Sequence, residues 1–378
     1  MSAPKAKHLM LTVAVPSEDL SYPIRIGSGL LDRLGREVVE ANTDARRVAL
    51  ITDDTVAALY AERAQQSLVA QGLKVSVHAI TPGERSKTPQ TLLGLVGEMV
   101  AAGLSRHDLV VTLGGGVVGD IGGLAAALFM RGIGVIQCPT SLLAQVDASV
   151  GGKVAVDLGA GKNLLGAFHF PDSVVIDTAV LSTLNDGELG CGLGEMVKHG
   201  LLFDAEHLAR LVEASDAIYA REPKTLARLV AHSVALKAAC VSRDPLERAS
   251  SGKGRILLNL GHTVGHAIEH ASNYRVRHGE AVAIGLQAAA RISEVRGLAA
   301  PGFEAEVKEM LSALRLPCTL DTWLAGEEGA SVERALSQDK KRAGASITYI
   351  ALRGVGEPCT LALRVDEILR LLRRDSPA

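Results

Sequence analysis

The sequence predicts an α/β first half built on a parallel sheet and an all-helical second half. Strand-like segments rich in Val and Ile alternate with helix-like segments up to about residue 180. Segments rich in Ala, Leu, Glu and Arg dominate after that point. Strands that alternate with helices form parallel sheets covered on both faces. We therefore expect two domains, 1–180 and 181–378, packed together with a ligand cleft between them.

The elements of the first half follow from apolar spacing. Apolar residues three and four apart predict helices at 54–70 and 89–102. Short β-branched runs between turn residues predict strands. These runs lie at 9–15, 22–26, 47–52, 74–80, 108–113, 133–138 and 173–177.

The second half is predicted to be a helical bundle that ends in a hairpin and one last helix. The hairpin strands are expected at 346–352 and 358–363, and the last helix at 366–373. The earlier helices are expected at 186–202, 205–214, 222–242, 262–273, 279–297, 302–314 and 331–337.

The composition indicates sizeable apolar cores and no strong net charge. Hydrophobic residues make up 47% of the 378 residues, and the net charge is -2. This argues against nucleic acid or a membrane surface as a partner. Asp120, Arg131 and Asp147 interrupt the longest apolar region, so we expect no membrane span. Five scattered cysteines without a Cys-x-x-Cys pair indicate a reducing cytoplasm.

A glycine-rich turn follows one of the predicted buried strands. Gly114, Gly116 and Gly119 satisfy Gly-x-Gly-x-x-Gly between a strand and a helix. Such glycines let the backbone approach a pyrophosphate, and the helix N-terminus supplies N–H donors. The ribose-binding acid that usually follows is missing, but Asp53 ends an earlier strand. The pattern predicts a Rossmann-like dinucleotide site in an unusual order.

Histidines gather in the second half. His262 and His266 lie four residues apart on one face of an expected helix, and His270 and His278 follow. Two histidines and a carboxylate are a common catalytic zinc set. Spacing alone favours His262 with His266, and Glu195 is a carboxylate on an otherwise apolar helix. Each of these residues could instead be an ordinary core or surface side chain, so the metal site is a hypothesis.

From about Asp53 to about Gly356 the chain resembles the 3-dehydroquinate synthase family of sugar phosphate cyclases. Several independent motifs occur in the family's order, which makes the resemblance far more specific than any one of them. The motifs are GGGVVGD, RG, PTSLLAQVDASVGGK, GKNLLGAF, GEMVKHG, LNLGHTVGHAIE, HGEAVAIG and QDKKRAG.

The resemblance implies a phosphate-eliminating lyase of the shikimate pathway, which leads to chorismate and the aromatic amino acids. It would convert 3-deoxy-D-arabino-heptulosonate 7-phosphate, an anionic sugar-acid phosphate, to 3-dehydroquinate and phosphate. NAD would bind the α/β domain and Zn²⁺ or Co²⁺ the helical domain. NAD would take a hydride from the substrate and return it, so that it is not consumed. The departing phosphate would remove its own proton, so no single protein base is required.

The resemblance also assigns roles by motif. The metal ligands would be Glu195, His262 and His278. The NAD contacts would be Asp53, Glu84, Lys87, Gly115, Gly116, Val117, Asp120, Thr140, Ser141, Lys162 and Thr183, joined by Gly119 and Lys153. The substrate contacts would be Asp147, Lys153, Asn163, Lys198, Lys237, Glu247, Arg255, Asn259, His266 and one of Lys340 and Lys341. Arg131 would reach the substrate phosphate from a partner subunit, in a homodimer.

The chain departs from the family motifs at three places. Ser141 replaces a threonine and keeps a hydroxyl, whereas Val154 replaces a threonine and removes one. The segment 243–255, RDPLERASSGKGR, has extra residues before its last arginine. Glu247 is then expected at the family's acidic position, and Lys253 competes with the arginine for its role.

Three other functions fit part of the pattern. Another sugar phosphate cyclase, such as an aminodehydroquinate or 2-deoxy-scyllo-inosose synthase, would share most motifs. A metal-dependent polyol dehydrogenase would accumulate NADH. A non-catalytic NAD-binding regulator would not depend on Lys153 or His262.

Overall fold

The structure is a computed structural model that describes residues 10–11, 21–159, 161–249, 254–343 and 346–374, without the side chains of 338–343. It has two compact units, Met1–Leu184 with Arg221–Ser242, and Asn185–Ala220 with Arg243–Ala378. The helix expected at 222–242 therefore belongs to the first compact unit. The division into domains 1–180 and 181–378 stays a prediction.

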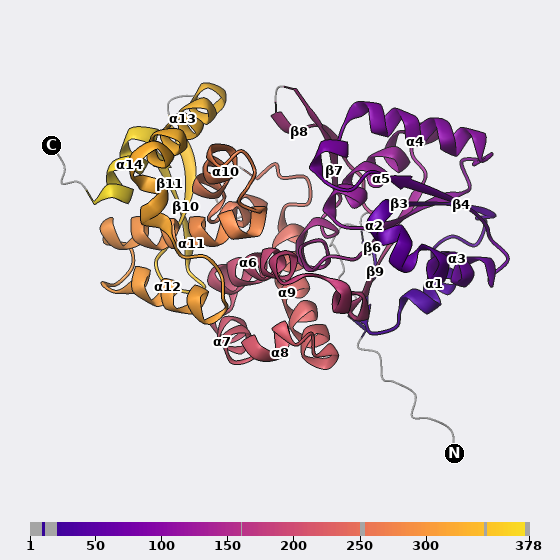
Figure 1. Cartoon of the computed structure of the whole chain (residues 1–378), viewed down its shortest axis with the longest axis horizontal. Helices are drawn as coiled ribbons and strands as arrows, with labels where there is room; N and C mark the ends of the chain where they lie inside the picture. Colours follow the sequence, from indigo (N-terminus) through magenta and orange to yellow (C-terminus); the bar gives the residue numbers. More distant parts are fainter. Residues whose placement is uncertain (1–9, 12–20, 160, 250–253, 344–345, 375–378) are drawn as a thin grey trace, which may run out of the picture. The chain divides into compact units, whose positions relative to one another are not determined.

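A seven-stranded sheet forms the centre of the first unit (Figure 1). Its order is β1-β2-β9-β6-β5-β3-β4. Among the described strands of this sheet, β1 alone pairs antiparallel, so the other six form the predicted parallel sheet. The strands are β1 Met10–Leu11, β2 Ile24–Gly27, β3 Arg47–Asp53, β4 Lys74–Ile80, β5 Leu109–Gly114, β6 Gly134–Pro139 and β9 Ser173–Asp177. Each strand except β1 matches a predicted strand closely. Of the strand predicted at 9–15, residues 9 and 12–15 lie outside the described residues.

Helices cover both faces of this sheet. Successive residues of a strand point to opposite faces, and β3 gives Ala49 and Ile51 to one core and Val48 and Leu50 to the other. The first core also takes residues from α4 Pro89–Ala101 and α5 Gly116–Leu128, and the second from α1 Leu34–Ala41 and α3 Glu62–Val69. The predicted α/β architecture is confirmed.

A hairpin absent from the sequence prediction carries several candidate site residues. It consists of β7 Lys153–Leu158 and β8 Gly161–Phe168, paired antiparallel with an irregularity between Val156 and Leu158. β7 gives Val154 and Val156 to a core, and the partly buried Ala167 of β8 packs against the same core. Most residues of β8 are exposed, which explains why apolar periodicity does not reveal this strand.

The second unit is mainly helical, as predicted. Its helices are α6 Asp186–Phe203, α7 Ala205–Glu213, α8 Ser215–Tyr219, α10 His262–Ala271, α11 His278–Val295, α12 Phe303–Ala313, α13 Gly326–Ala343 and α14 Val365–Arg373. The predicted hairpin is present as β10 Ile347–Leu352 and β11 Pro358–Leu363. In the first unit, α9 Pro223–Arg243 is the one described helix long and apolar enough to cross a membrane. Since 56% of that apolar window is buried inside the protein, this is weak support for a span.

Candidate active site

In the first unit, the N-terminus of α5 lies open at the end of β5. Gly115 occupies the N-cap position, and no side chain of the described residues caps the helix there. A Cβ atom on Gly116 would meet only Ala148 Cβ, at 3.4 Å, and one on Gly115 only Ser141 Oγ, at 3.6 Å. A helix N-terminus carries unpaired N–H groups and a partial positive charge. This turn can therefore receive an anionic group such as a phosphate.

Gly119 also serves packing. A Cβ atom there would lie 2.9 Å from Gln137 Oε1, and one on Gly122 would lie 2.6 Å from Thr112 Cγ2. These contacts let α5 lie close to the sheet. Gly119, predicted as a cofactor contact, thus has a structural reason of its own to be glycine.

A buried lysine joins α5 to the β7–β8 hairpin. Lys87 Nζ lies 2.6 Å from Asp120 Oδ2 and donates to Asn163 Oδ1 at 2.5 Å. Burial lowers the pKa of Lys87, but Asp120 outweighs burial and the net shift is upward. Burial raises the pKa of Asp120 to about 6, against the opposing effect of Lys87. Both groups are therefore charged at neutral pH and hold three predicted site residues together.

The other predicted NAD contacts of the first unit lie on several elements. Asp53 Oδ1 accepts hydrogen bonds from the N–H groups of Thr55 and Val56, as the N-cap of a helix. Thr183 Oγ1 lies 2.7 Å from Tyr60 Oη, and Lys162 Nζ lies 3.4 Å from Glu84 Oε1.

Thr140, Ser141 and Val117 lie closer to the glycine turn. The N–H of Thr140 donates to Gly114 O, at 2.9 Å. Ser141 Oγ accepts from Ala144 N, at 3.2 Å, and Val117 belongs to the first turn of α5. These three residues and the glycine turn therefore form one neighbourhood at the ends of β5 and β6.

Asp147 and Lys237 meet within the first unit. Asp147 lies in a π-helical turn, Ala144–Ala148, after β6, and Lys237 is a buried residue of α9. Lys237 Nζ lies 2.9 Å from Asp147 Oδ1 and also donates to the Asp147 carbonyl. The buried side chain of Gln145 donates to the carbonyls of Pro139 and Asp177, which fixes the turn to the ends of β6 and β9.

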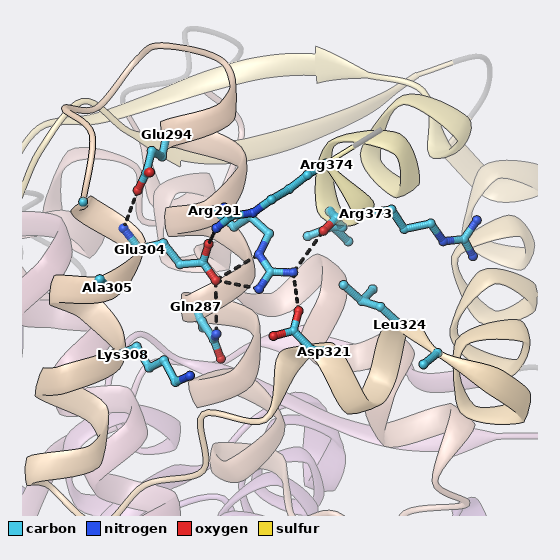
Figure 2. A pocket seen from close by; sticks show the side chains of 13 residues that line it. Gln287, Arg291, Glu294, Glu304, Ala305, Lys308, Asp321, Leu324, Arg373 and Arg374 are labelled. Carbon is cyan, nitrogen blue, oxygen red and sulfur yellow. Dashed lines mark hydrogen bonds and ion pairs between the residues drawn. The ribbon is translucent and has the colours of Figure 1, made fainter. Parts of the chain in front are cut away.

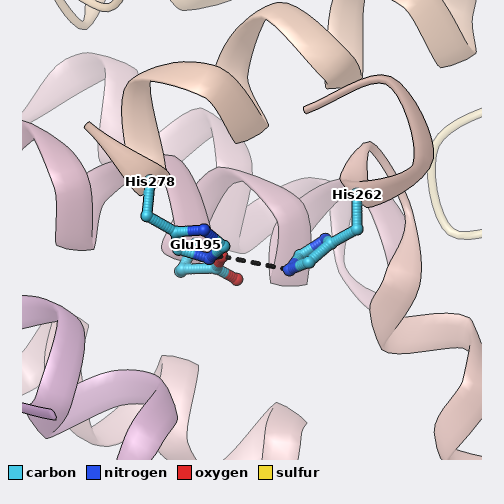
Figure 3. Close-up of side chains that lie close together, drawn as sticks. All are labelled: Glu195, His262 and His278. Carbon is cyan, nitrogen blue, oxygen red and sulfur yellow. Dashed lines mark ion pairs between the residues drawn. The ribbon is translucent and has the colours of Figure 1, made fainter. Parts of the chain in front are cut away.

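In the second unit, Glu195, His262 and His278 come together (Figure 3). One ligand atom from each lies within 4.8 Å of the others. Glu195 Oε1 lies 3.6 Å from His262 Nε2 and 3.4 Å from His278 Nε2. Two imidazoles and one carboxylate that converge in this way suit a divalent metal such as zinc. The pairing of His262 with His266, favoured by spacing alone, is not the one that meets Glu195.

Close helix contacts bring these three side chains together. A Cβ on Gly194 would lie 2.5 Å from Gly279 O, so α6 and α11 touch through their backbones. A Cβ on Gly285 would lie 1.9 Å from Gly261 O, which brings α11 against the start of α10. Glu195 follows Gly194, His262 follows Gly261, and His278 precedes Gly279. Each candidate ligand is therefore next in sequence to a glycine of these contacts.

Each histidine of this cluster has a second hydrogen-bond partner that orients its ring. His262 Nδ1 lies 3.0 Å from Leu260 O, and His278 Nδ1 lies 3.1 Å from Glu269 Oε2. A donated Nδ1–H leaves Nε2 free to bind a metal ion. Glu269 is buried and was missed in the sequence analysis, although it follows His266 by one helical turn.

Burial, followed by the charge of Lys198, lowers the pKa of His262 to about 3. His278 differs: burial lowers its pKa, but hydrogen bonds to Glu195 and Glu269 raise it to about 10. His262 is therefore neutral at pH 7, ready to act as a ligand. His278 holds a proton that a bound cation would displace.

Other candidates of the second unit lie around this cluster. His266 is exposed, and its ring centroid lies 5.2 Å from that of His262 and 5.9 Å from that of His278. Lys198 is buried and forms an ion pair with Glu195. His270 lies beside the Tyr274 ring and belongs to none of the metal-compatible groups of the described residues.

The segment 243–255 is described in part. Arg255 is buried and Nη1 donates to Pro245 O at 3.1 Å, whereas Glu247 and Asn259 are exposed. Lys253, the competitor of Arg255, lies outside the described residues. Lys340 and Lys341 belong to α13, but their side chains also lie outside the described part.

A separate pocket of about 670 Å³ lies in the second unit (Figure 2). The buried Arg291 guanidinium donates to Glu304 Oε1 and lies 2.6 Å from Asp321 Oδ1. Glu304 also accepts from Gln287 and from Arg374. These charges satisfy one another, and none of the lining residues is a predicted site residue.

Comparisons with known proteins identify the family of the chain. Residues 77–191 match the N-terminal and residues 192–342 the C-terminal family model of 3-dehydroquinate synthase. The 3-dehydroquinate synthase of Caulobacter vibrioides is 42% identical over 354 residues, 92% of this chain and 94% of that protein.

Solved structures show the same fold. A 2-deoxy-scyllo-inosose synthase complexed with carbaglucose-6-phosphate, NAD⁺ and Co²⁺ has a TM-score of 0.85 at 26% identity, covering 97% of this chain and 100% of that one. The 2-epi-5-epi-valiolone synthase of Streptomyces hygroscopicus, with NAD⁺ and Zn²⁺ bound, has a TM-score of 0.82 at 27% identity, covering 95% and 99%. Matching family models and a close curated relative together show that the chain belongs to the 3-dehydroquinate synthase family.

Proposed function

We propose that the chain is a 3-dehydroquinate synthase that converts 3-deoxy-D-arabino-heptulosonate 7-phosphate to 3-dehydroquinate and phosphate, with NAD and a divalent metal. The observation that carries this proposal is the convergence of Glu195, His262 and His278 in a chain of this family. The 42% identity to a 3-dehydroquinate synthase exceeds the 26% to a 2-deoxy-scyllo-inosose synthase, which favours the former substrate. No disulfide joins cysteines in the described part of the chain, which supports a place in the cytoplasm.

The residues present fit a divalent cation. Glu195, His262 and His278 would hold it, and the carbonyl of Leu260 and the carboxylate of Glu269 would keep the two rings in place. When bound, a divalent metal holds oxygen ligands of the substrate and lowers the pKa of a hydroxyl. His266, exposed beside this cluster, would orient a substrate hydroxyl or relay a proton.

The first unit would hold NAD and part of the substrate. The open N-terminus of α5 suits the NAD pyrophosphate, and Asp53, at the end of β3, suits a ribose hydroxyl. Lys87 would stabilise the turn by fixing Asp120 and Asn163. Asp147 forms an ion pair with the buried Lys237, and this lysine would attract an anionic group of the substrate.

Charged side chains would bind the substrate's carboxylate and phosphate. Lys153 is the exposed first residue of β7, and Lys198 is held beside Glu195. Arg255 offers a planar guanidinium suited to two-point contact with an oxyanion. Glu247 and Asn259 would orient hydroxyls, and one of Lys340 and Lys341 would complete the set.

We also propose a homodimer in which Arg131 serves the partner's site. Arg131 is exposed, with φ of 73°, and the described residues offer it no ion pair. Large exposed apolar side chains lie near it in sequence, at Leu128 and Met130, and others lie on β8, at Leu164 and Phe168. Apolar groups of this kind often mark a protein interface.

Mixing two inactive variants tests the exchange of Arg131. If Arg131 acts across the dimer, heterodimers of Arg131→Ala and His278→Ala subunits contain one complete site and regain activity. If it acts within its own subunit, neither site is complete and the mixture stays inactive. Sedimentation of the wild type measures the dimer independently.

The function itself is tested by phosphate release. Purified protein with NAD and Zn²⁺ should release phosphate from the heptulosonate phosphate, and chelation should abolish this until metal is restored. Glucose 6-phosphate in the same assay should release none. Phosphate release from glucose 6-phosphate, with none from the heptulosonate phosphate, would assign the chain to another cyclase.

A further inference from the structure

Between α9 and α10, backbone N–H groups from two places in the chain donate to a single carboxylate, that of Asp244. Its Oδ1 accepts hydrogen bonds from the N–H groups of Arg248, at 2.8 Å, and Ala249, at 3.1 Å. Its Oδ2 accepts from the N–H of Arg255, at 3.3 Å. Asp244 is only 6% exposed, so these bonds are shielded from water. One side chain therefore fixes both ends of the segment that carries the extra residues.

The same contact fixes the place of Arg255. Its guanidinium Nη1 donates to Pro245 O at 3.1 Å, next to Asp244 in the chain. Gly254, just before it, approaches the carboxylate so closely that a Cβ would lie 2.4 Å from Asp244 Oδ2. The backbone of Arg255 is thus hydrogen-bonded to Asp244, and its side chain to Pro245.

We infer that Asp244 is a positioning residue that holds Arg255 for substrate binding, so that the length of the segment between Ala249 and Gly254 does not set the place of the guanidinium. The inference rests on the proposed function, because Arg255 is assigned to the substrate there. Asp244 acts through Arg255 and has no contact with the substrate.

The first test replaces the carboxylate by an amide. The Asn side chain of Asp244→Asn has one oxygen and one NH₂ group. Its NH₂ group would then face a backbone N–H group, and two donors cannot form a hydrogen bond. The KM for the heptulosonate phosphate should rise by at least about tenfold, the effect of losing a hydrogen bond to a charged group. The change should fall mainly on KM, because a binding contact is lost in ground and transition states alike. Asp44→Asn, at an exposed position outside both sites, is the matched control.

A double-mutant cycle separates positioning from general structural support. In an Arg255→Ala background, Asp244→Asn should have no further effect on KM, because its action runs through the missing side chain. Additive effects of the two substitutions would overturn the inference. Hydrogen exchange at the Arg255 amide should also accelerate in Asp244→Asn, a readout that does not depend on activity.

Gly254→Ala disturbs the same contact without changing a charge, and it keeps the test valid if Asp244→Asn fails to fold. It should raise KM in the same way, whereas Gly97→Ala, where a Cβ meets open space, should not. Deleting Ser250 and Ser251 should leave KM within about twofold, a change no larger than that of a neutral surface substitution. A deletion effect as large as that of Asp244→Asn would contradict the inference. Wild-type protein without phosphate release would instead refute the proposed function.

Discussion

Glycines do opposite things in the two units. In the first unit, a Cβ on Gly115 or Gly116 would make only ordinary van der Waals contacts with the described residues, at 3.6 and 3.4 Å. In the second unit, Gly194 and Gly285 are filled positions, because the backbone of a neighbouring helix occupies the place of a side chain. The first pair leaves room for a ligand beside bare N–H groups. The second pair lets helices approach until side chains from three of them converge. A glycine next to a site can thus serve either the ligand or the packing.

The largest effect is expected from removing a metal ligand. His278→Ala should abolish metal retention and lower phosphate release by at least about a thousandfold, because the cation supplies several kcal/mol of stabilisation in such reactions. Elemental analysis of the purified variant measures the metal. His270→Ala, outside the cluster, should keep a full complement. Unchanged metal content in His278→Ala would show that the ligand set is wrong.

Alanine at the two kinds of glycine in α5 should separate binding from stability. Gly116→Ala places a methyl group where the cofactor phosphates are expected, so the Kd for NAD should rise about tenfold to hundredfold with little change in stability. Gly122→Ala places its methyl group 2.6 Å from Thr112 Cγ2 and should cost about 1–3 kcal/mol of unfolding free energy. Calorimetric titration and thermal unfolding measure the two quantities. Equal effects of both variants on NAD affinity would remove the distinction.

A smaller loss is expected when the partner of a ligand is changed. Glu269→Gln keeps the size of the side chain but weakens its hold on His278 Nδ1, so metal affinity should fall about tenfold or more. The variant should regain most activity at high Zn²⁺ concentration, unlike His278→Ala. Competition with a chelator measures the affinity. Affinity equal to that of the wild type would mean that Glu269 does not orient the ring.

The smallest effect on activity is expected at the pocket outside both sites. Burial raises the pKa of Glu304, but hydrogen bonds from Arg291 and Arg374 outweigh it and the net shift is downward from 4.5. This carboxylate therefore contributes stability above about pH 4.5 that is lost as the pH falls through its lower folded pKa. Glu304→Gln should lose about 2 kcal/mol at neutral pH, lack this acid-dependent loss and keep kcat and KM. Denaturant unfolding at several pH values measures this loss of unfolding free energy. A changed KM would connect the pocket to the candidate active site.

The sequence predicted most of the fold, because regular apolar periodicity marks the buried faces of strands and helices. It missed the β7–β8 hairpin, whose outer strand buries almost nothing. Spacing pointed to α10 for the candidate metal site but paired His262 with His266, because spacing relates only residues on one helix. His278 joins through the glycine contact between α10 and α11, which is long-range in the sequence. Glu269 and Asp244 were missed because their partners lie nearby in the chain but beyond regular helix spacing, so only the folded backbone shows the contacts.

The most direct test of the account follows phosphate and NADH together, with purified protein, Zn²⁺, the heptulosonate phosphate and less NAD than substrate. The account predicts that released phosphate exceeds the NAD present many times over, while the NADH absorbance stays flat at steady state. NADH that accumulates in step with product would reveal a dehydrogenase, and the absence of phosphate would contradict the account outright.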